Sequence, residues 1–399
     1  MVAAVSAGIP GDTDDDRCVS ETELADAIIP FMEATFLGEA TPHLDKDDLQ
    51  SAASACLRNT WFVTDDLGRR VEVPTSPEHV ICSNAGALRY LTYLQAEDLI
   101  VGVDSIEAQV QQYDTRPYAI ANPQFKNYPV FGEYLGRDDP EKIVALDPQP
   151  QVIFKTYVYQ AAEADALQEK TGGIPVVCLN YGDLGVYRSD VDRDLRLMGS
   201  IVGKEERAEG VIEFFDSTIA DLNSRTEGVP DSEKKSVYVG GIAYYGPQGL
   251  QSTEPAYPPF MFVNAKNVAA ELGTDHAEVA KEKIVDWDPE VIFVDLGTLG
   301  SPPETSALNQ LKNDPAYANL SARNSGEIYG LVSYNYYTTN LGSVIADGYY
   351  IGKVLYPDRF SDIDPVQKAD EIYTFLVDDA VFDTLNNAFY GKGFTKLTL

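Results

Sequence analysis

Residues 63–104 read VTDDLGRRVEVPTSPEHVICSNAGALRYLTYLQAEDLIVGVD, and this stretch decides the fold. Its first part, 64–70, carries two aspartates and a glycine, the residue types of a tight hairpin turn. Two short apolar runs, 79–82 and 99–103, have the length of buried strands. Between them, leucines and tyrosines at helical spacing follow residues 83–84, which we expect to cap a helix. A strand, a helix and a strand in succession predict a βαβ unit, and therefore a parallel sheet.

A second signal is an internal repeat. Residues 140–155 read PEKIVALDPQPQVIFK, and residues 281–295 read KEKIVDWDPEVIFVD. Both contain EKIV, two further residues, Asp-Pro and a strand-like run with VIF. This similarity predicts a duplicated α/β lobe in which a helix precedes a buried strand. Between the repeats, residues 190–225 place apolar side chains at helical spacing without a proline, and 204–225 predict one long helix.

The opening stretch resembles a known family. A turn of the type DDLGR, a β-branched run, a proline, and a strand entering a helix with GAxxxLxxLxAEDxIVGV are similar to the start of the substrate-binding proteins of iron-complex and cobalamin ABC importers. The resemblance covers most of residues 61–399. It implies two lobes joined by a rigid helix, a cleft for the transported solute, and a permease dimer as partner. It does not specify the ligand.

The predicted fold class is therefore α/β, with two Rossmann-like lobes of parallel sheet and helices joined by a long helix, and a small N-terminal helical extension. The chain of 399 residues is long enough for two domains and an extension. We predict the extension at 1–60, the first lobe at 61–185, the linking helix region at 186–227 and the second lobe at 228–399.

Charge and hydropathy limit the location and the partners. Asp plus Glu number 63 against 30 Lys plus Arg, a net charge of −33, which argues against nucleic acid and anionic membranes as partners. No stretch approaches the ~20 apolar residues of a membrane helix. Residues 1–10, MVAAVSAGIP, are compatible with the end of a removed secretion signal. We expect an extracytoplasmic monomer, at the cell surface, in the periplasm or secreted.

Residues 11–23, GDTDDDRCVSETE, have the oxygen spacing of a calcium loop. One helix is predicted directly after this loop, and a second helix is predicted at 43–57. Calcium needs about six to eight oxygen ligands wrapped around one point. The run resembles one EF-hand or dockerin loop, but Arg17 stands where such a loop has glycine and would need a left-handed backbone. An acidic loop that caps a helix is the alternative. The predicted Ca²⁺ ligands are Asp12, Asp14, Asp16, Cys18 through its carbonyl, Ser20 and Glu23.

The ligand site is predicted from the fold. In open parallel sheets ligands bind outside the carboxyl ends of the strands, and two facing lobes would line one cleft. Tyrosine recurs in the loops after the predicted strands, where its ring and hydroxyl suit an organic, polar ligand and its phenolate suits ferric iron. For each tyrosine the alternative is a loop-stabilising role. The candidate ligand-binding residues are Asn84, Glu133, Tyr134, Lys155, Tyr157, Tyr181, Tyr244, Tyr245, Tyr334, Asn335 and Tyr336.

We expect the protein to capture a ferric complex, a siderophore or another metal chelate and to deliver it to the permease. A corrinoid, or an oxyanion such as molybdate or tungstate, is the alternative within the same fold. We expect no enzyme, because the three histidines do not cluster in the sequence and no nucleophile or phosphate-binding motif is present. A secreted carbohydrate-active enzyme with a dockerin-like module is the alternative of a different class, which the repeat disfavours.

Two further sets of residues complete the predictions. Glu141 and Glu282 occupy the same place in the two EKIV phrases, where the helix dipole favours a carboxylate. The resemblance implies that an acidic residue at this place in each lobe meets an arginine cluster on the permease. None of the four cysteines forms a CxxC pair. Two are expected to be buried in strands, Cys82 and Cys178, and two are candidates for a disulfide, Cys18 and Cys56.

Overall fold

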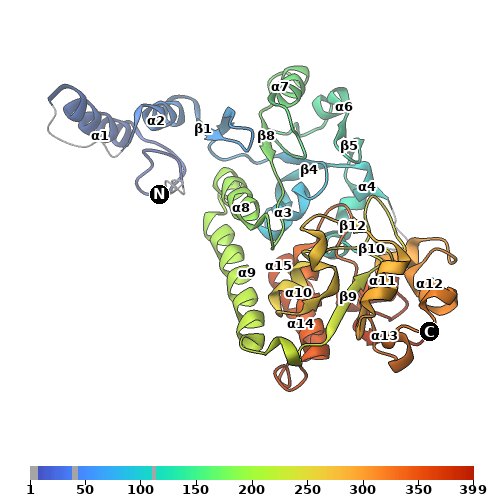
Figure 1. Cartoon of the computed structure of the whole chain (residues 1–399). Helices are drawn as coiled ribbons and strands as arrows, with labels where there is room; N and C mark the ends of the chain where they lie inside the picture. Colours follow the sequence, from blue (N-terminus) through green and yellow to red (C-terminus); the bar gives the residue numbers. More distant parts are fainter. Residues whose placement is uncertain (1–7, 38–43, 110–113) are drawn as a thin grey trace. The chain divides into compact units, whose positions relative to one another are not determined.

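The computed structural model describes residues 8–37, 44–109 and 114–399 (Figure 1). The chain divides into two compact units, and the division does not follow one cut in the sequence. Residues 110–123, predicted within the first lobe, group with the second unit. The first unit holds Met1–Gln109, Gln124–Tyr181 and Ser189–Ile212, and the second holds Val110–Pro123, Gly182–Arg188 and Glu213–Leu399.

The first unit begins with the predicted helical pair. Helix α1 (Glu21–Met32) follows the acidic loop and continues into a π-helical turn, and α2 (Lys46–Arg58) is the second helix. Ser20 caps α1 and Asp45 caps α2, each through a reciprocal capping box with an acidic residue three positions later. His43, at the predicted start of the second helix, lies outside the described residues.

The predicted hairpin and parallel sheet both form. Strands β1 (Thr60–Thr64) and β2 (Arg70–Pro74) pair antiparallel. The main sheet of this unit has the order β6-β5-β4-β3-β7-β8, in which only β6 runs antiparallel to its neighbour. This confirms the predicted fold class. The strands of this sheet are β3 (Val80–Ser83), β4 (Ile100–Asp104), β5 (Val130–Glu133), β6 (Arg137–Asp138), β7 (Val152–Thr156) and β8 (Val176–Leu179).

Helix α3 (Ala87–Tyr93) joins β3 to β4 as predicted, but its predicted cap was wrong. The N-cap is Gly86, with φ 93°, rather than Ser83 or Asn84. A Cβ at this glycine would clash with the ring of Tyr181. Glycine is therefore required here both for the backbone conformation and for the close approach of that ring.

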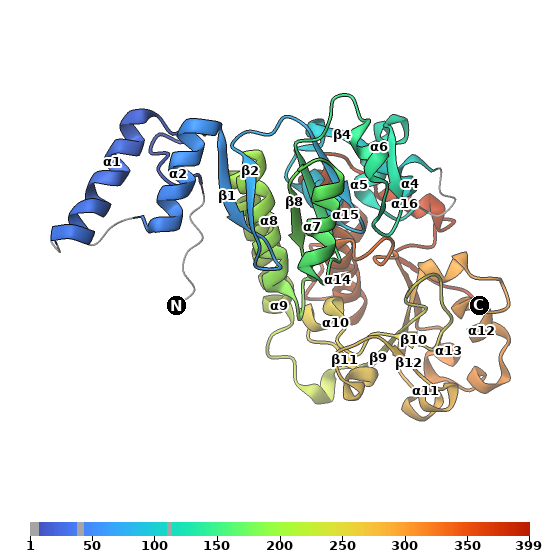
Figure 2. The same ribbon diagram turned by 90° about the horizontal axis from the view of Figure 1, so that it is seen from above.

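The polar, aromatic and strand-poor sequence of residues 109–127 predicts a loop, but the described part of this segment is partly helical. It contains α5 (Pro117–Ala121) and a 3-10 helix at Pro123–Asn127, because a proline at the first position fixes the backbone angle that each helix needs. The other helices of the first sheet are α4 (Ser105–Ala108), α6 (Pro140–Val144) and α7 (Ala161–Lys170), and α7 lies beside β8 (Figure 2).

The predicted long helix is α9 (Glu205–Thr226), and the boundary between the units, after Ile212, falls within it. It is separated from α8 (Arg188–Val202) by Gly203, whose φ of 70° ends the preceding helix. None of the described helices is long and apolar enough to cross a membrane.

The second unit has its own parallel sheet, ordered β11-β9-β13-β14-β15, with β15 antiparallel at the edge. Its strands are β9 (Ser236–Gly240), β11 (Lys266–Asn267), β13 (Val291–Asp295), β14 (Ile328–Leu331) and β15 (Thr395–Lys396). Two short strands, β10 (Ser252–Thr253) and β12 (Ala277–Glu278), pair separately. The sequence predicts a helix near 265–272, but Lys266 and Asn267 pair with β9, and only a 3-10 turn, Val268–Leu272, follows them.

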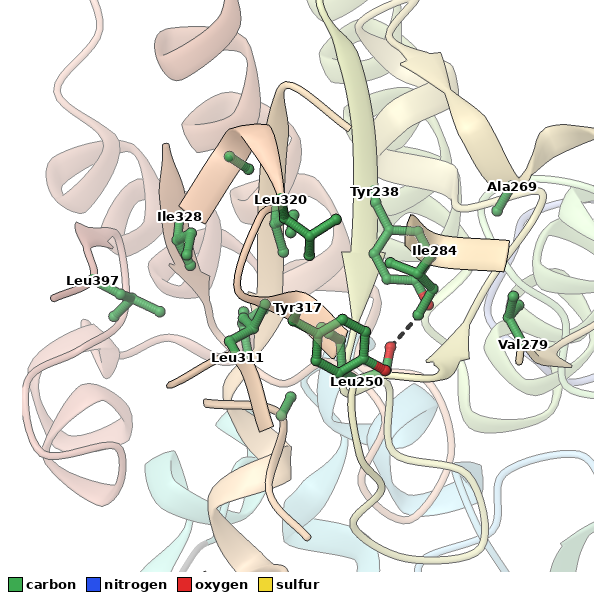
Figure 3. Close-up of a cluster of buried hydrophobic side chains, with 14 residues drawn as sticks. Tyr238, Leu250, Ala269, Val279, Ile284, Leu311, Tyr317, Leu320, Ile328 and Leu397 are labelled. Carbon is green, nitrogen blue, oxygen red and sulfur yellow. Dashed lines mark hydrogen bonds between the residues drawn. The ribbon is translucent and has the colours of Figure 1, made fainter. Parts of the chain in front are cut away.

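The core of the second unit lies under this sheet (Figure 3). Tyr238 donates a hydrogen bond from its hydroxyl to the Leu250 carbonyl at 2.8 Å, which lets a tyrosine sit among apolar side chains. Ile284 of the repeat is fully buried here, and Ile143 at the same repeat position is fully buried in the first unit. The helices of this unit are α10 (Pro258–Phe262), α11 (Lys281–Trp287), α12 (Ala307–Asn313), α13 (Ser321–Ser325), α14 (Leu341–Leu355), α15 (Pro365–Val377) and α16 (Phe382–Ala388).

Candidate functional site

The loops that follow the strands of both sheets share an unusual backbone feature. Six of these loops carry a non-glycine residue in the left-handed region, where bulky side chains are rare and where the conformation costs about 1–3 kcal/mol. Such residues mark sites at which the surrounding structure imposes a conformation. They are Asn84 after β3 (φ 72°), Leu135 after β5 (φ 61°), Tyr157 after β7 (φ 54°), Tyr181 after β8 (φ 56°), Tyr245 after β9 (φ 49°) and Tyr337 after β14 (φ 51°). Four of the six are tyrosines, three of them among the predicted ligand-binding residues.

At the centre of the first sheet, Asn84 bridges two strand ends. Its side-chain amide donates to the Thr156 carbonyl at 3.1 Å, and its side-chain oxygen accepts from the Ala85 amide at 2.8 Å. These two bonds fix the strained backbone after β3 and tie it to the end of β7. Glu133 and Tyr134, at the end of β5, are exposed, with the Tyr134 amide bonded to the Ser105 hydroxyl at 3.0 Å.

The ammonium of Lys155, a candidate ligand-binding group, already has partners within the first unit. It forms an ion pair with Asp138 and donates to the Ser83 hydroxyl and the Gly136 carbonyl, both at 3.0 Å. An ammonium has three donors, and all three are used inside the unit. The contacts of Lys155 therefore indicate a structural role, and it is not carried into the proposal below.

Tyr181, in the loop after β8, packs its ring against Gly86 in the loop after β3. It is buried, its ring stacks on Tyr90 with centroids 4.6 Å apart, and its hydroxyl accepts a hydrogen bond from the Arg89 guanidinium. Burial holds the pKa of the Tyr181 phenol above its usual range, so the hydroxyl stays protonated at neutral pH. Tyr157 lies next to it, with ring centroids 6.4 Å apart.

The DDLGR turn supports the loop that carries Tyr181. Asp66 accepts from the Asn180 amide at 2.7 Å and forms an ion pair with Arg193, and Asp194 accepts from the Tyr181 amide at 2.8 Å. Burial and the neighbouring Asp66 carboxylate raise the pKa of Asp194 well above its usual value. The sequence signature of the turn therefore acts by positioning a loop residue more than one hundred positions later.

In the second unit, the loop after β14 carries three candidates, Tyr334, Asn335 and Tyr336. Tyr334 is buried, with its ring centroid 5.7 Å from that of Tyr257. Asn335 donates to the Ala243 carbonyl at 2.6 Å and so ties this loop to the one after β9. The Arg116 guanidinium lies over the Tyr336 ring, 5.6 Å from its centroid.

Two completely buried arginines, Arg89 and Arg116, were missed by sequence reasoning. Arg89 lies on α3, where only the apolar spacing was informative, and Arg116 lies in a segment predicted as loop. Arg116 forms an ion pair with Asp114 at 2.7 Å. A guanidinium keeps its charge at any physiological pH, so each arginine places a fixed positive group against a candidate tyrosine.

Buried carboxyl groups underlie the same edge of the second sheet. Asp295, at the end of β13, is completely buried and accepts from the Gly297 amide at 2.7 Å. Burial raises its pKa to about 7. Burial also raises the pKa of Glu254 to about 7, and that of Asp347, which accepts from the Val332 amide, well above its usual range. Asp295 and Glu254 therefore titrate near neutral pH instead of near pH 4.

The predicted calcium loop brings its first three acids together. Carboxylate oxygens of Asp12, Asp14 and Asp16 lie within 4.8 Å of one another. Glu23 instead accepts from the Thr13 amide at 2.8 Å and from the Ser20 amide at 3.0 Å. Hydrogen bonds from the Thr13 and Ser20 hydroxyls and amides lower the pKa of Glu23 to about 2. The Cys18 amide donates to Asp16 at 2.8 Å, and Cys18 and Cys56 are both free thiols.

Arg17 adopts the left-handed backbone that the loop requires, with φ 63°. Its side chain leaves the loop altogether. The guanidinium donates to the carbonyls of Ser200 and Ile201 at the end of α8, at 2.8 and 3.0 Å, and to the Thr75 carbonyl. The positive charge of Arg17 therefore caps the C-terminal end of α8, which explains how arginine is accommodated at a glycine position.

Glu141 and Glu282 are exposed in the first turns of α6 and α11. Within the described residues neither carboxylate takes part in an ion pair. The lysine that follows each of them pairs with another acid, Lys142 with Asp139 at 3.8 Å and Lys283 with Glu271 at 2.7 Å. Both glutamates therefore present an uncompensated negative charge to solvent.

Comparisons with known proteins agree with this architecture. Residues 80–334 match the family model described as periplasmic binding protein. The molybdate-binding protein MolA of Haemophilus influenzae is 21% identical over 82% of this chain and 95% of its own, and its molybdate-bound structure superimposes with a TM-score of 0.62. The petrobactin-binding protein YclQ of Bacillus subtilis is 24% identical over 68% of this chain and 80% of its own.

A solved periplasmic solute-binding protein of Veillonella parvula has a TM-score of 0.65 at 20% identity, covering 83% of this chain and 97% of that one. The family match spans well over half of the chain and includes every strand of the two main sheets except β15. The chain thus belongs to the periplasmic binding protein family and is an extracytoplasmic solute-binding protein of an ABC importer.

Proposed function

We propose that the transported ligand is a ferric complex, a siderophore or another metal chelate, bound by the loops at the carboxyl ends of the strands. The observation that carries this proposal is the set of left-handed tyrosines, Tyr157, Tyr181, Tyr245 and Tyr337. Backbone strain maintained at one edge of each sheet is characteristic of a ligand site. Tyrosine offers a ring for the organic part of a chelate, and tyrosines other than the buried, protonated Tyr181 also offer a hard oxygen for its ferric ion.

The charge of the buried arginines supports an anionic ligand. Arg89 donates to the Tyr181 hydroxyl, which leaves the oxygen of that phenol polarised, and Arg116 lies over the Tyr336 ring. An oxygen-rich ferric complex with net negative charge would be favoured over a neutral corrinoid at such an edge.

An oxyanion such as molybdate or tungstate is the second candidate. It is favoured by the similarity to MolA, which extends over 82% of this chain. A small tetrahedral anion binds through hydrogen-bond donors and does not stack on exposed aromatic rings, so we place it second.

Thermal unfolding with a set of defined probes tests the ligand class. Ferric citrate and a ferric catecholate complex should raise the melting temperature, because a ligand that binds only the folded state stabilises it by mass action. Molybdate, tungstate and cobalamin are the comparison probes. A shift with molybdate or tungstate alone would replace the chelate by the oxyanion, and no shift with any probe would reject both. Native mass spectrometry with metal analysis of the purified protein gives an independent reading.

We further propose that Glu141 and Glu282 dock the protein to a permease dimer, that it acts as a monomer, and that it releases its ligand unchanged. The exposed, unbalanced charge of both glutamates supports the docking role. We also propose that the loop containing Asp12, Asp14 and Asp16 binds Ca²⁺, supported by the convergence of their carboxylates. Light scattering tests whether the protein is a monomer. A calcium titration tests the metal site, and chemical analysis of the released ligand tests whether it is unchanged.

A further inference from the structure

Two tyrosines in the loop after β9 form a cluster of three aromatic rings with a histidine from another segment. The Tyr244 ring lies parallel to the His276 ring, with centroids 3.9 Å apart and an interplanar angle of 3°. The Tyr245 ring meets Tyr244 edge-on, with centroids 4.7 Å apart and an angle of 76°. We call Tyr244, Tyr245 and His276 the aromatic ledge. It joins the loop after β9 to the residue that precedes β12, so two separate segments fix its geometry.

His276 is held at the base of the ledge by one hydrogen bond. The Ser252 hydroxyl lies 2.6 Å from the Ile242 carbonyl and 2.8 Å from His276 Nε2. A carbonyl only accepts, so the hydroxyl hydrogen is used there and Nε2 must carry a hydrogen that it donates to Ser252. Burial lowers the pKa of His276, so the ring is neutral at pH 7 and stacks on Tyr244 without a net charge.

Tyr245 forms the exposed end of the ledge. Its side chain is 96% exposed and its backbone is left-handed, with φ 49°. It sits at the apex of a tight turn that the Tyr244 amide closes on the Gly246 carbonyl at 2.9 Å. The Tyr245 ring has its edge-on contact with Tyr244 and is otherwise open to solvent, and a strained, exposed ring of this kind is available to a ligand.

The surroundings of the ledge indicate which part of a ligand it would meet. Residues 243–253, AYYGPQGLQST, contain no charged side chain. Tyr244 and Tyr245 therefore offer ring faces and edges within a loop that has no charged residue, in contrast to the edge beneath Arg116. Flat conjugated groups pair with such rings in stacked or edge-to-face arrangements.

We propose that the aromatic ledge is a stacking subsite for a flat conjugated group of the bound chelate, such as a catechol ring. This inference rests on the proposed function and adds that the ligand carries an aromatic group. Tyr245 makes the contact, while His276 and Ser252 are positioning residues that hold Tyr244 behind it. A ligand without a flat face, such as ferric citrate or molybdate, would leave the ledge unused.

Binding of two ferric complexes to matched variants tests the subsite. Tyr245→Ala should weaken binding of a ferric catecholate complex about 5- to 100-fold, the range of one lost aromatic stack, and weaken ferric citrate, which has no flat ring, by a clearly smaller factor. Tyr245→Phe keeps the ring and should recover most of the catecholate affinity that Tyr245→Ala loses. Tyr390→Ala, which removes a tyrosine that is 65% exposed elsewhere in the unit, is the control and should change neither affinity.

The positioning role has its own readout. His276→Ala should weaken catecholate binding, and His276→Phe should restore most of it, because the ring is what supports Tyr244. A role in stability alone would lower the melting temperature of both variants without this rescue.

The outcomes separate the subsite from the function on which it rests. If Tyr245→Ala binds the catecholate complex as the wild type does, or loses ferric citrate equally, the subsite is wrong. If the wild type binds ferric citrate or molybdate but no aromatic chelate, the subsite is wrong and the transport function stands. If it binds none of these probes, both are wrong.

Discussion

Arg17 and Glu205 form an ion pair of 2.7 Å that joins the acidic N-terminal loop to the first turn of α9. The Arg17 side chain is only 20% exposed, and its guanidinium also donates to the last carbonyls of α8. Arg17 therefore connects the acidic N-terminal loop to the junction of α8 and α9. The same side chain occupies the loop position at which glycine would otherwise be expected.

This contact makes a prediction about stability. Replacing Arg17 by Met should lower the free energy of unfolding by about 1–3 kcal/mol, because three backbone carbonyls lose a charged donor and Glu205 loses its partner. Arg58→Met is the matched control. Its guanidinium is 71% exposed and lies 3.8 Å from Glu72, so its removal should cost no more than about 0.5 kcal/mol. Urea unfolding of both variants measures the difference, and equal losses would show that the capping contacts of Arg17 contribute nothing.

Calcium should act on the same loop. Adding Ca²⁺ should slow amide hydrogen exchange in residues 11–23 and in α1, and a chelator should reverse this, because the bound ion would draw the carboxylates of Asp12, Asp14 and Asp16 onto one point. Exchanging Asp14 and Asp16 together for Asn should abolish the effect. Exchanging Asp47 and Asp48 of α2 in the same way is the control and should leave it intact. Unchanged exchange in the wild type would remove the site.

The repeat and the long helix could be predicted from the sequence, because each rests on local periodicity. Ile143 and Ile284 have the same place in the phrase and the same full burial in the two units. The buried arginines could not be predicted, since the partner of Arg89 is Tyr181, 92 residues away. Strands β11 and β15 are too short to leave a pattern and exist because longer strands offer them a free edge. The left-handed tyrosines are likewise imposed by tertiary packing, as the clash that forbids a Cβ at Gly86 illustrates.

Asp295 makes stability depend on pH in a defined direction. Its pKa is raised to about 7 in the folded protein, and Glu254 and Asp347 face it with carboxyl groups of raised pKa. The folded state therefore binds more protons than the unfolded state between about pH 4 and pH 7, so stability falls as pH rises through this range. Asp295→Asn should reduce this dependence, since Glu254 and Asp347 remain, and be more stable than the wild type at pH 8 by about 1–3 kcal/mol, with a smaller gain at pH 5. Urea unfolding at the two pH values checks it, and a gain that is larger at pH 5 would contradict it.

The tyrosine hydroxyls at the two sheet edges should contribute to ligand affinity. Tyr157→Phe and Tyr336→Phe each keep the ring and remove one oxygen, so each should weaken binding of ferric citrate about tenfold if that oxygen contacts the ligand. Tyr390→Phe is the control variant and should bind normally. Isothermal titration measures the affinities, and unchanged binding in both variants would assign these tyrosines to loop stability alone.

Glu141 and Glu282 should affect delivery without affecting capture. Both are exposed at the start of repeat-related helices and neither is balanced by a lysine of its own phrase. Separated charges of this kind orient a protein on an oppositely charged partner and leave remote sites unchanged. The double variant Glu141→Gln and Glu282→Gln should therefore bind the reconstituted permease at least tenfold more weakly, as expected for two lost charge-assisted contacts, and should retain its affinity for ferric citrate.

A second double variant separates docking from a general loss of negative charge. Glu169→Gln and Glu304→Gln remove the same number of exposed carboxylates, one from each unit, and should leave permease binding unchanged. The effect of the first pair should also shrink as salt is added, because exposed charges are screened over about 8–10 Å at physiological ionic strength. If the first pair supports full uptake, or if it loses ligand affinity instead, the two carboxylates serve only to stabilise the first turns of α6 and α11 through the helix dipole.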